Sequence, residues 1–148
     1  MLEIYRPIVE ETAISFELVV PTVEDFAARI EEVVGTHDWL VADADGAIAG
    51  YAYAYSHRAR EAYQRSAEVS VYLHPDYQGQ GLAKELYNAL FDSIRAKGFH
   101  YAYAGIALPN DSSLALHAAL GFTEIGTFSE VGFKYGVWHD VSWWQRKI

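Results

Sequence analysis

The chain has 148 residues, of which 51% are hydrophobic and 15% aromatic, and its formal net charge is −9. This composition excludes a disordered chain, and the length favours one domain, which we expect to span residues 1–148. The absence of cysteine excludes disulfides, a thiolate nucleophile and cysteine-ligated zinc, and the negative charge disfavours non-specific nucleic-acid binding.

The first residues of the chain lack the features of a targeting segment. No basic region followed by an apolar run occurs there, so a secretory signal peptide is not expected. No apolar run approaches membrane-spanning length. These observations predict a cytoplasmic protein without a membrane partner.

Hydrophobic periodicity predicts an alternation of helices and strands typical of an α/β fold. Thr22 is expected to cap the second helix, and Asp45-Gly46 is a strong two-residue hairpin signal. Asp111 or Ser112 is expected to cap the last helix. The expected helices are 2–12, 23–34, 83–97 and 111–120; the expected strands are 39–44, 47–55, 67–73, 101–108, 122–128 and 137–144, with loops at 56–66 and 129–136. This order predicts a mixed sheet with helices on its faces.

The segment 67–83 joins a strand to a helix through a glycine loop. Pro75 ends the strand because proline cannot donate to a ladder. Gly79 and Gly81 let the backbone approach a ligand, and the first amides of the following helix lack intrahelical partners. Together these features predict a pyrophosphate cradle. The dinucleotide and triphosphate loops are excluded, since a third glycine and a Gly-Lys-Ser/Thr triplet are missing; a plain glycine turn that caps a helix is the alternative.

A second candidate feature is a group of basic residues in an acidic chain. Arg58, Arg60 and Arg65 lie within eight residues, with only Glu61 among them. This group favours docking of an anionic small molecule, and a solvated loop is the alternative.

Four motifs resemble those of one enzyme superfamily and occur in the same order. The loop Gln78–Ala83 looks like the acyl-coenzyme A loop of the GNAT N-acetyltransferases, and residues 105–122 resemble their second signature. Residues 131–141 closely resemble the C-terminal motif of the phosphinothricin and methionine sulfoximine N-acetyltransferases, and residues 58–68 are similar to the substrate loop of that subgroup. The resemblance implies the GNAT fold, a mixed, mostly antiparallel twisted sheet flanked by helices. One departure is that the strand with which the family opens is missing, so either the start is assigned too late or the fold does without an edge strand.

The resemblance also implies roles for particular residues. Glu68 matches the family's glutamate base, and His117 stands where the subgroup has a histidine that could act as an acid or second proton-transfer group. A charge partner and a packed histidine are the respective alternatives. The resemblance assigns coenzyme binding to Val71, Tyr72, Leu73, Gln78, Gly79, Gln80, Gly81, Leu82, Ala83 and Asn110, and substrate binding to Phe16, Arg60, Tyr63 and Lys134. Asn110 could also be an ordinary cap or turn residue.

The predicted function is acetyl transfer from acetyl-CoA directly to the α-amine of a small amino acid analogue: phosphinothricin, methionine sulfoximine or methionine sulfone. The alternatives are a non-catalytic acyl-CoA-binding module and an acetyltransferase for another small amine. The family implies a homodimer. The remaining histidines show no metal-ligand spacing, so no metal is expected.

Overall fold

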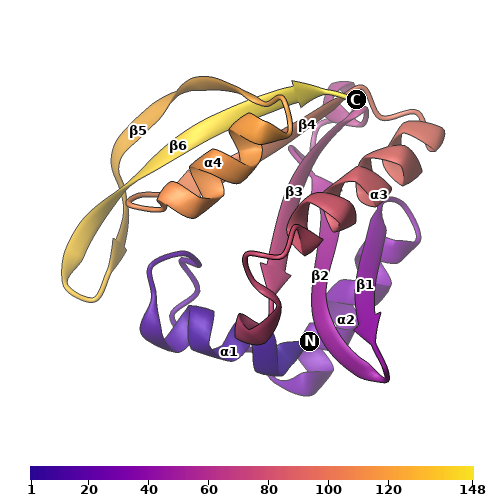
Figure 1. The fold of residues 1–148 in the computed structure, drawn as a ribbon. Helices are drawn as coiled ribbons and strands as arrows, with labels where there is room; N and C mark the ends of the chain where they lie inside the picture. Colours follow the sequence, from indigo (N-terminus) through magenta and orange to yellow (C-terminus); the bar gives the residue numbers. More distant parts are fainter.

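The structure, a computed structural model, describes every residue from 1 to 148. Six strands form one sheet in the order β1-β2-β3-β4-β6-β5. Neighbouring strands run antiparallel except β3 and β4, which run parallel. The helices are α1 (Leu2–Glu11), α2 (Val23–Val34), α3 (Leu82–Ala96) and α4 (Asp111–Ala119), with short 3-10 turns η1 (Glu61–Tyr63) and η2 (Pro75–Tyr77); the strands are β1 (Asp38–Ala44), β2 (Ala47–Ser56), β3 (Ser66–Leu73), β4 (Tyr101–Ala107), β5 (Thr123–Lys134) and β6 (Val137–Lys147). The expected mixed, mostly antiparallel sheet flanked by helices is confirmed (Figure 1).

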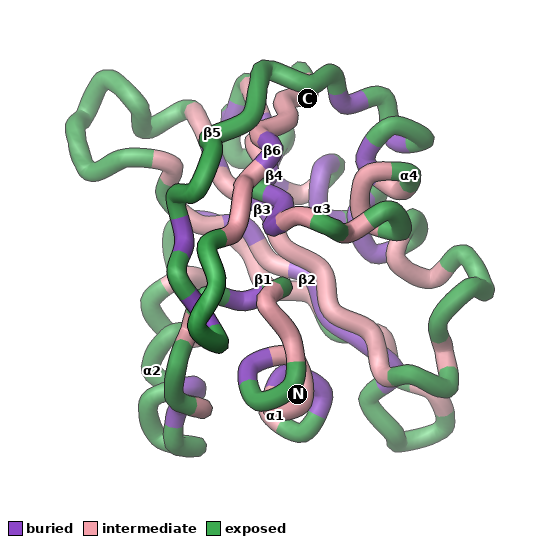
Figure 2. Tube along the Cα trace, turned by 90° about the vertical axis from the view of Figure 1, so that its left-hand side faces the viewer, coloured by how far each residue is buried: buried purple, intermediate pink, exposed green.

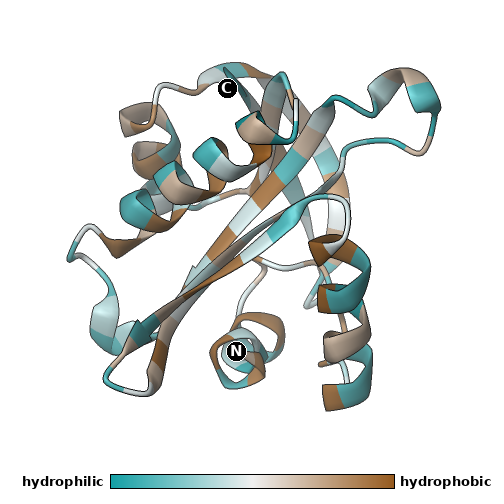
Figure 3. Cartoon of the chain, turned by 90° about the vertical axis from the view of Figure 1, so that its right-hand side faces the viewer, coloured by the Kyte–Doolittle hydropathy of each residue, from teal (hydrophilic) through white to brown (hydrophobic).

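Different helices cover the two faces of the sheet (Figure 1). Side chains alternate along a strand, so Ala52 and Ala54 of β2 pack against the buried stripe of α3 while Tyr51 packs against α1 and α2. In Figure 3, the helices carry hydrophobic and hydrophilic residues next to one another along their turns. In α3 the buried residues are Leu86, Tyr87, Leu90, Phe91 and Ile94, which recur at the helical spacing from which this helix is predicted in the sequence.

Local signals near the N-terminus act as the sequence predicts. The Thr22 hydroxyl accepts a hydrogen bond from the Asp25 amide and caps α2. Asp45 and Gly46, at φ 53° and 88°, turn β1 back into β2. Two left-handed residues in succession are typical of the turns that suit a twisted hairpin.

Two expectations near the C-terminus are wrong. β5 continues to Lys134 through most of the expected loop 129–136, and the hairpin turns only at Tyr135-Gly136. The register of β5 against β6 is irregular between Phe128 and Gly132. This irregularity interrupts the alternation of inward and outward side chains from which strands are predicted, so the second part of β5 was not recognised in the sequence. The cap of α4 is Asn110 rather than Asp111 or Ser112, because its side-chain oxygen accepts the amide hydrogen of Ser113.

The two outer strands differ in their surroundings. β1 pairs only with β2, and the first element of the described chain is α1. β5 and β6 form a long hairpin whose turn reaches α1, where Lys134 and Tyr135 donate to the Val9 carbonyl oxygen, and most of β5 is exposed (Figure 2). No helix combines the length and apolar character needed to cross a bilayer.

Candidate active site

β3 and β4 separate partway along their length. They pair at Ser66–Tyr101, Ala67–Ala102 and Glu68–Tyr103, and no pair follows. Beyond that point β3 is bonded only to β2 and β4 only to β6. We call this opening the β3–β4 split. It leaves two strand edges with free backbone groups facing each other, an arrangement that can accept an extended ligand as an added strand.

A small cavity of about 70 Å³ lies in the β3–β4 split. Its walls come from both strand edges, from α4 and from the α3 side chain of Tyr87. The lining includes Val71 and Tyr72 of β3, residues 104–107 of β4, and Asn110 and His117 beside them. The split therefore brings together Val71, Tyr72 and Asn110, three of the residues to which the family resemblance assigns coenzyme binding.

The glycine loop lies between β3 and α3. Gly79 and Gly81 have φ of 72° and 87°, in the left-handed region that favours glycine. The Gln80 side chain donates to the Asp76 carbonyl and holds the loop. None of the five backbone amides from 79 to 83 donates to a protein oxygen. Five free amides at a helix N-terminus form a site suited to a diphosphate.

Glu68 is the last residue of β3 that pairs with β4, and it faces α1 and α2 rather than α3. Its carboxylate accepts a hydrogen bond from the Tyr55 hydroxyl at 2.8 Å on Oε2, and the His57 Nδ1 lies 3.0 Å from Oε1. Burial, assisted by the negative charge of Glu68, raises the pKa of Tyr55, so its hydroxyl remains a donor. The Glu68 side chain is only 13% exposed.

Glu68 lines a larger cavity of about 370 Å³, which we call the Glu68 cavity. Most of its lining is apolar, and Tyr55, Glu68 and Ser70 are its polar members. The remaining lining residues are Ile14, Phe16, Val69, Gly105, Ala107, Phe128, Val131, Val141 and Trp143. Val69, Ser70 and Gly105 also line the split, so the two cavities adjoin beside the carboxylate.

The segment between α1 and α2 supplies one wall of the Glu68 cavity. Its Ser15 and Glu17 side chains bind the Tyr5 hydroxyl, and Arg29 of α2 forms a two-bonded ion pair with Glu17. Phe16 lies between these anchors. Its ring lies so close to Gly132 of β5 that a Cβ there would lie 2.2 Å from it. With any other residue at that position, the Phe16 ring would have to move from its place in this wall.

Lys134 lies outside the lining of the Glu68 cavity. Its side chain is buried, and its ammonium donates to the carbonyl oxygens of Val9 at 2.7 Å and Ser15 at 2.8 Å. Burial lowers the pKa of Lys134. Lys134 thus joins the end of α1 to the segment that carries Phe16, whereas the family resemblance assigns it to substrate binding.

Arg60 and Tyr63 belong to the exposed loop between β2 and β3 and do not line the Glu68 cavity either. Tyr63 meets the His57 ring edge-on, with centroids 6.0 Å apart. Arg58, in the same loop, lies 3.5 Å from Glu68 Oε1 and is 52% exposed. The structure therefore brings this basic loop to the carboxylate through Arg58 and His57.

His117 lies buried beside the split. Its Nδ1 is 2.7 Å from the Ser113 carbonyl oxygen, which carries no hydrogen, so Nδ1 is the protonated nitrogen. The other nitrogen, Nε2, then accepts from the Tyr87 hydroxyl at 3.4 Å. Burial lowers the pKa of His117 and favours this neutral form.

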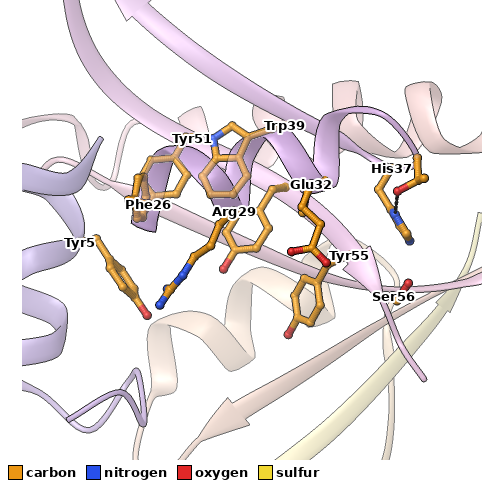
Figure 4. A pocket seen from close by; sticks show the side chains of 12 residues that line it. Tyr5, Phe26, Arg29, Glu32, His37, Trp39, Tyr51, Tyr55 and Ser56 are labelled. Atoms are coloured by element: carbon orange, nitrogen blue, oxygen red, sulfur yellow. Dashed lines mark hydrogen bonds between the residues drawn. The ribbon is translucent and has the colours of Figure 1, made fainter. Parts of the chain in front are cut away.

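A further cavity, of about 330 Å³, lies between α2 and the sheet (Figure 4). Aromatic side chains, among them Phe26, Trp39 and Tyr51, form its walls, and Arg29 and Glu32 line it from α2. It shares only Tyr55 with the Glu68 cavity. No group of three or more His, Asp or Glu side chains in the structure is placed to hold a metal ion.

The sequence analysis missed Tyr55 and His57 as partners of Glu68. Tyr55 lies directly opposite Glu68 in the β2–β3 register. Both residues lie in strands that the sequence predicts, so the correct register between these two strands would have identified Tyr55 as the partner of Glu68. His57 follows β2 and had no comparable signal, since it lies in a loop.

Comparisons with known proteins agree with this geometry. The family model described as an acetyltransferase (GNAT) domain matches residues 1–143. The phosphinothricin N-acetyltransferase of Streptomyces viridochromogenes is 40% identical over 144 residues, 97% of this chain and 79% of that protein. The L-methionine sulfoximine/L-methionine sulfone acetyltransferase of Salmonella typhimurium is 38% identical over 109 residues, 74% of this chain and 64% of that protein.

One similar solved structure contains the acetyl donor, acetyl-CoA. The GNAT superfamily phosphinothricin acetyltransferase of Sinorhizobium meliloti, in complex with AcCoA, superposes with a TM-score of 0.94 at 38% identity and covers 99% of this chain and 80% of that one. The family match, the sequence identities and the shared fold lead to one conclusion. The chain belongs to the GNAT family and is an acetyl-CoA-dependent N-acetyltransferase.

Proposed function

We propose that this chain acetylates the α-amine of a small amino acid analogue by direct transfer, without a covalent acyl-enzyme. The observation that carries the proposal is the position of Glu68, where the Glu68 cavity adjoins the β3–β4 split. The names of the relatives, which act on phosphinothricin or on methionine sulfoximine and sulfone, support this class of acceptor.

Acetyl-CoA is a substrate here and supplies the acetyl group as a thioester. We assign the pyrophosphate to the free amides of residues 79–83, with Gln78 beside them, because a helix N-terminus attracts anions. The free edge of Val71, Tyr72 and Leu73 would bind the pantetheine arm and polarise the thioester carbonyl. Asn110 would contribute its side-chain NH2 group to the arm, since its oxygen already caps α4.

Glu68 is assigned as the base that removes a proton from the acceptor's ammonium, directly or through a water. A carboxylate is a poor base near neutral pH unless it is desolvated or a water relays the proton. The low exposure of Glu68 supports desolvation. We assign His117 as a second proton-transfer group, with Nε2 as the reacting atom because Nδ1 is bound to Ser113. Since Nε2 carries no hydrogen in the neutral ring, it would first take up a proton released by the acceptor's amine and then pass that proton to the departing thiolate.

The lining of the Glu68 cavity favours an acceptor with an uncharged tail. Phe16 and its apolar neighbours offer no cation to an anionic phosphinate. We therefore expect methionine sulfone and methionine sulfoximine to be better acceptors than phosphinothricin. Arg60 and Tyr63 are proposed to reach the acceptor's carboxylate from their exposed loop, and Lys134 is proposed to act by holding the Phe16 segment.

Three further proposals concern the whole molecule. The single continuous sheet and the family match to residues 1–143 support one N-acetyltransferase domain over 1–148.

Exposed apolar side chains on the β5–β6 hairpin support a homodimer; they are Ile125, Phe128, Val131, Phe133, Tyr135, Val137 and Trp138. Light scattering after size-exclusion chromatography tests the dimer. The cytoplasm is the proposed compartment, and fractionation of expressing cells tests it.

The decisive experiment replaces Glu68 with Gln and measures thiol release and acetyl-CoA affinity separately. With methionine sulfone as acceptor, Glu68→Gln should lower kcat by about 10²-fold or more while the Kd for acetyl-CoA stays within twofold. Glu31→Gln, an exposed change on α2, is the matched control and should behave as wild type.

Three results would overturn the proposal. They are wild-type turnover by Glu68→Gln, an equal loss of turnover and coenzyme affinity, and no thiol release from wild type with any of the three amino acid analogues. Release only with a polyamine such as spermidine would assign the site to another small amine.

A further inference from the structure

The two oxygens of the Glu68 carboxylate have different partners. Oε1 lies 3.0 Å from His57 Nδ1 and 3.5 Å from the exposed guanidinium of Arg58. Oε2 accepts one hydrogen bond, from the Tyr55 hydroxyl at 2.8 Å. Each carboxylate oxygen has two lone pairs. Oε1 therefore has a partner for both of its lone pairs, whereas Oε2 keeps one lone pair that no protein group uses.

These partners also line different cavities. Tyr55 lines the Glu68 cavity together with Glu68 itself, and His57 and Arg58 do not. His57 and Arg58 line a neighbouring cavity of about 270 Å³, to which neither Glu68 nor Tyr55 contributes. The carboxylate therefore has Oε1 on the side of the neighbouring cavity and Oε2 on the side of the cavity that we assign to the acceptor.

Both Tyr55 and His57 donate to the carboxylate. The His57 ring stacks on Tyr103 of β4, with centroids 4.4 Å apart and planes 16° from parallel, and its side chain is 14% exposed. An ionised carboxylate carries no hydrogen, so Nδ1 of His57 supplies the hydrogen of its bond to Glu68. Tyr55 also donates, because burial raises the pKa of its hydroxyl. Both bonds therefore stabilise the charged form of Glu68.

The surroundings of the carboxylate determine how it responds to pH. The titratable and charged groups that face it are Tyr55 of β2 and, from the loop that follows β2, His57 and Arg58. Tyr63 of η1 and Tyr103 of β4 face the His57 ring. The rest of the Glu68 cavity is apolar except for one serine. Apolar surroundings favour a protonated carboxylic acid, whereas donated hydrogen bonds favour the carboxylate.

We propose that Tyr55 and His57 are positioning residues that keep Glu68 ionised and leave Oε2 as the atom that receives the acceptor's proton. The inference rests on the proposed role of Glu68 as base. An N–H bond of the acceptor's ammonium breaks and an O–H bond forms at Oε2, directly or through a water, which frees the amine lone pair to attack the thioester carbon. Tyr55 and His57 keep their own hydrogens. The proton on Oε2 passes to solvent when the products leave, and the carboxylate is restored.

The test is the pH dependence of the single-turnover rate with both substrates saturating. Tyr55→Phe removes the donor at Oε2, and His57→Phe removes the donor at Oε1 but keeps a ring that can stack on Tyr103. Loss of either donor makes Glu68 easier to protonate, so the acidic limb of the profile should move to higher pH by about one unit. The rate on that limb should then fall about tenfold, and above the limb it should return to within about threefold of wild type.

A conservative variant and a control separate the donated hydrogen from the packing. The side-chain amide of His57→Asn can donate from near the position of Nδ1, so its profile should lie close to that of wild type. Tyr101→Phe is the control for Tyr55→Phe, because Tyr101 lines none of these cavities, and it should match wild type. The acetyl-CoA Kd should stay within twofold in every variant. His57→Leu, which also lacks a donor, replaces His57→Phe if that protein does not fold.

The outcomes also separate this inference from the proposed function. A loss of rate that is equal at every pH would overturn the inference, because it is what a purely structural role predicts. An unshifted profile in either Tyr55→Phe or His57→Phe would overturn it as well, while an impaired Glu68→Gln would leave the role of Glu68 in place. Wild-type turnover by Glu68→Gln would instead overturn the role of Glu68 and this inference with it.

Discussion

Gly81 offers a direct test of the coenzyme loop. It is the residue before α3, its φ is +87°, and a Cβ built on it meets no atom within 4 Å. An alanine there has no steric clash, so its cost is conformational. A non-glycine residue in the left-handed region costs about 1–2 kcal/mol, which for a chain of this size lowers the Tm by about 2–8 °C.

Gly46 is a matched control. It lies in the turn between β1 and β2, its φ is +88°, and a Cβ there also meets nothing within 4 Å. Gly46→Ala and Gly81→Ala should therefore lose similar stability. Only Gly81→Ala should change coenzyme binding, because its new methyl group or a relaxed backbone disturbs the free amides. Losing one hydrogen bond to a charged group removes about 1.5–3 kcal/mol, which raises the Kd about 10- to 100-fold.

Isothermal titration with acetyl-CoA and thermal unfolding of the three proteins measure both quantities. The expected result is equal loss of Tm in the two variants, with weaker acetyl-CoA binding in Gly81→Ala alone. Wild-type affinity in Gly81→Ala would refute the reasoning, and so would an equal loss of affinity in both variants.

Three other changes test separate parts of the account. Lys134→Met removes the two hydrogen bonds that join Val9 of α1 to Ser15 beside Phe16; urea unfolding should show a loss of about 1–3 kcal/mol and kinetics a higher acceptor KM, and an unchanged KM would contradict this role. Asn110→Ala removes the cap of α4, which should cost about 1 kcal/mol and also weaken acetyl-CoA binding; a change in stability alone would leave Asn110 as a cap only. Because burial lowers the pKa of His117 in the folded state, the unfolded chain binds that proton first as pH falls below about 6.5. Wild-type stability should therefore fall on acidification more steeply than that of His117→Gln, and equal slopes in urea unfolding across that range would contradict it.

The sequence predicts the fold well where local signals agree with the tertiary structure. The Thr22 cap, the Asp45-Gly46 turn and the apolar stripe of α3 are determined by nearby residues, so they can be recognised without knowing the fold. The second half of β5 could not be recognised. Its positions beyond Phe128 follow an irregular register, and they belong to a strand only because β6 pairs with them.

The candidate site likewise has one part that a local sequence pattern predicts and other parts that depend on the tertiary structure. The glycine loop is a local signal, and the structure leaves its amides free as the prediction requires. The contacts of Lys134 depend on packing between segments more than a hundred residues apart, which no local pattern reports. The Tyr55 and His57 contacts with Glu68 depend on the register of two strands and on a loop.

The central claim is that acetyl-CoA occupies the β3–β4 split with its pyrophosphate on the amides of residues 79–83. The most direct measurement is a titration of the 15N-labelled protein with acetyl-CoA, followed by backbone amide NMR. We predict the largest shifts at Gly79, Gly81 and the β3 residues 71–73, with little change at Gly46. Shifts confined to the cavity between α2 and the sheet, with the glycine loop unmoved, would contradict the account.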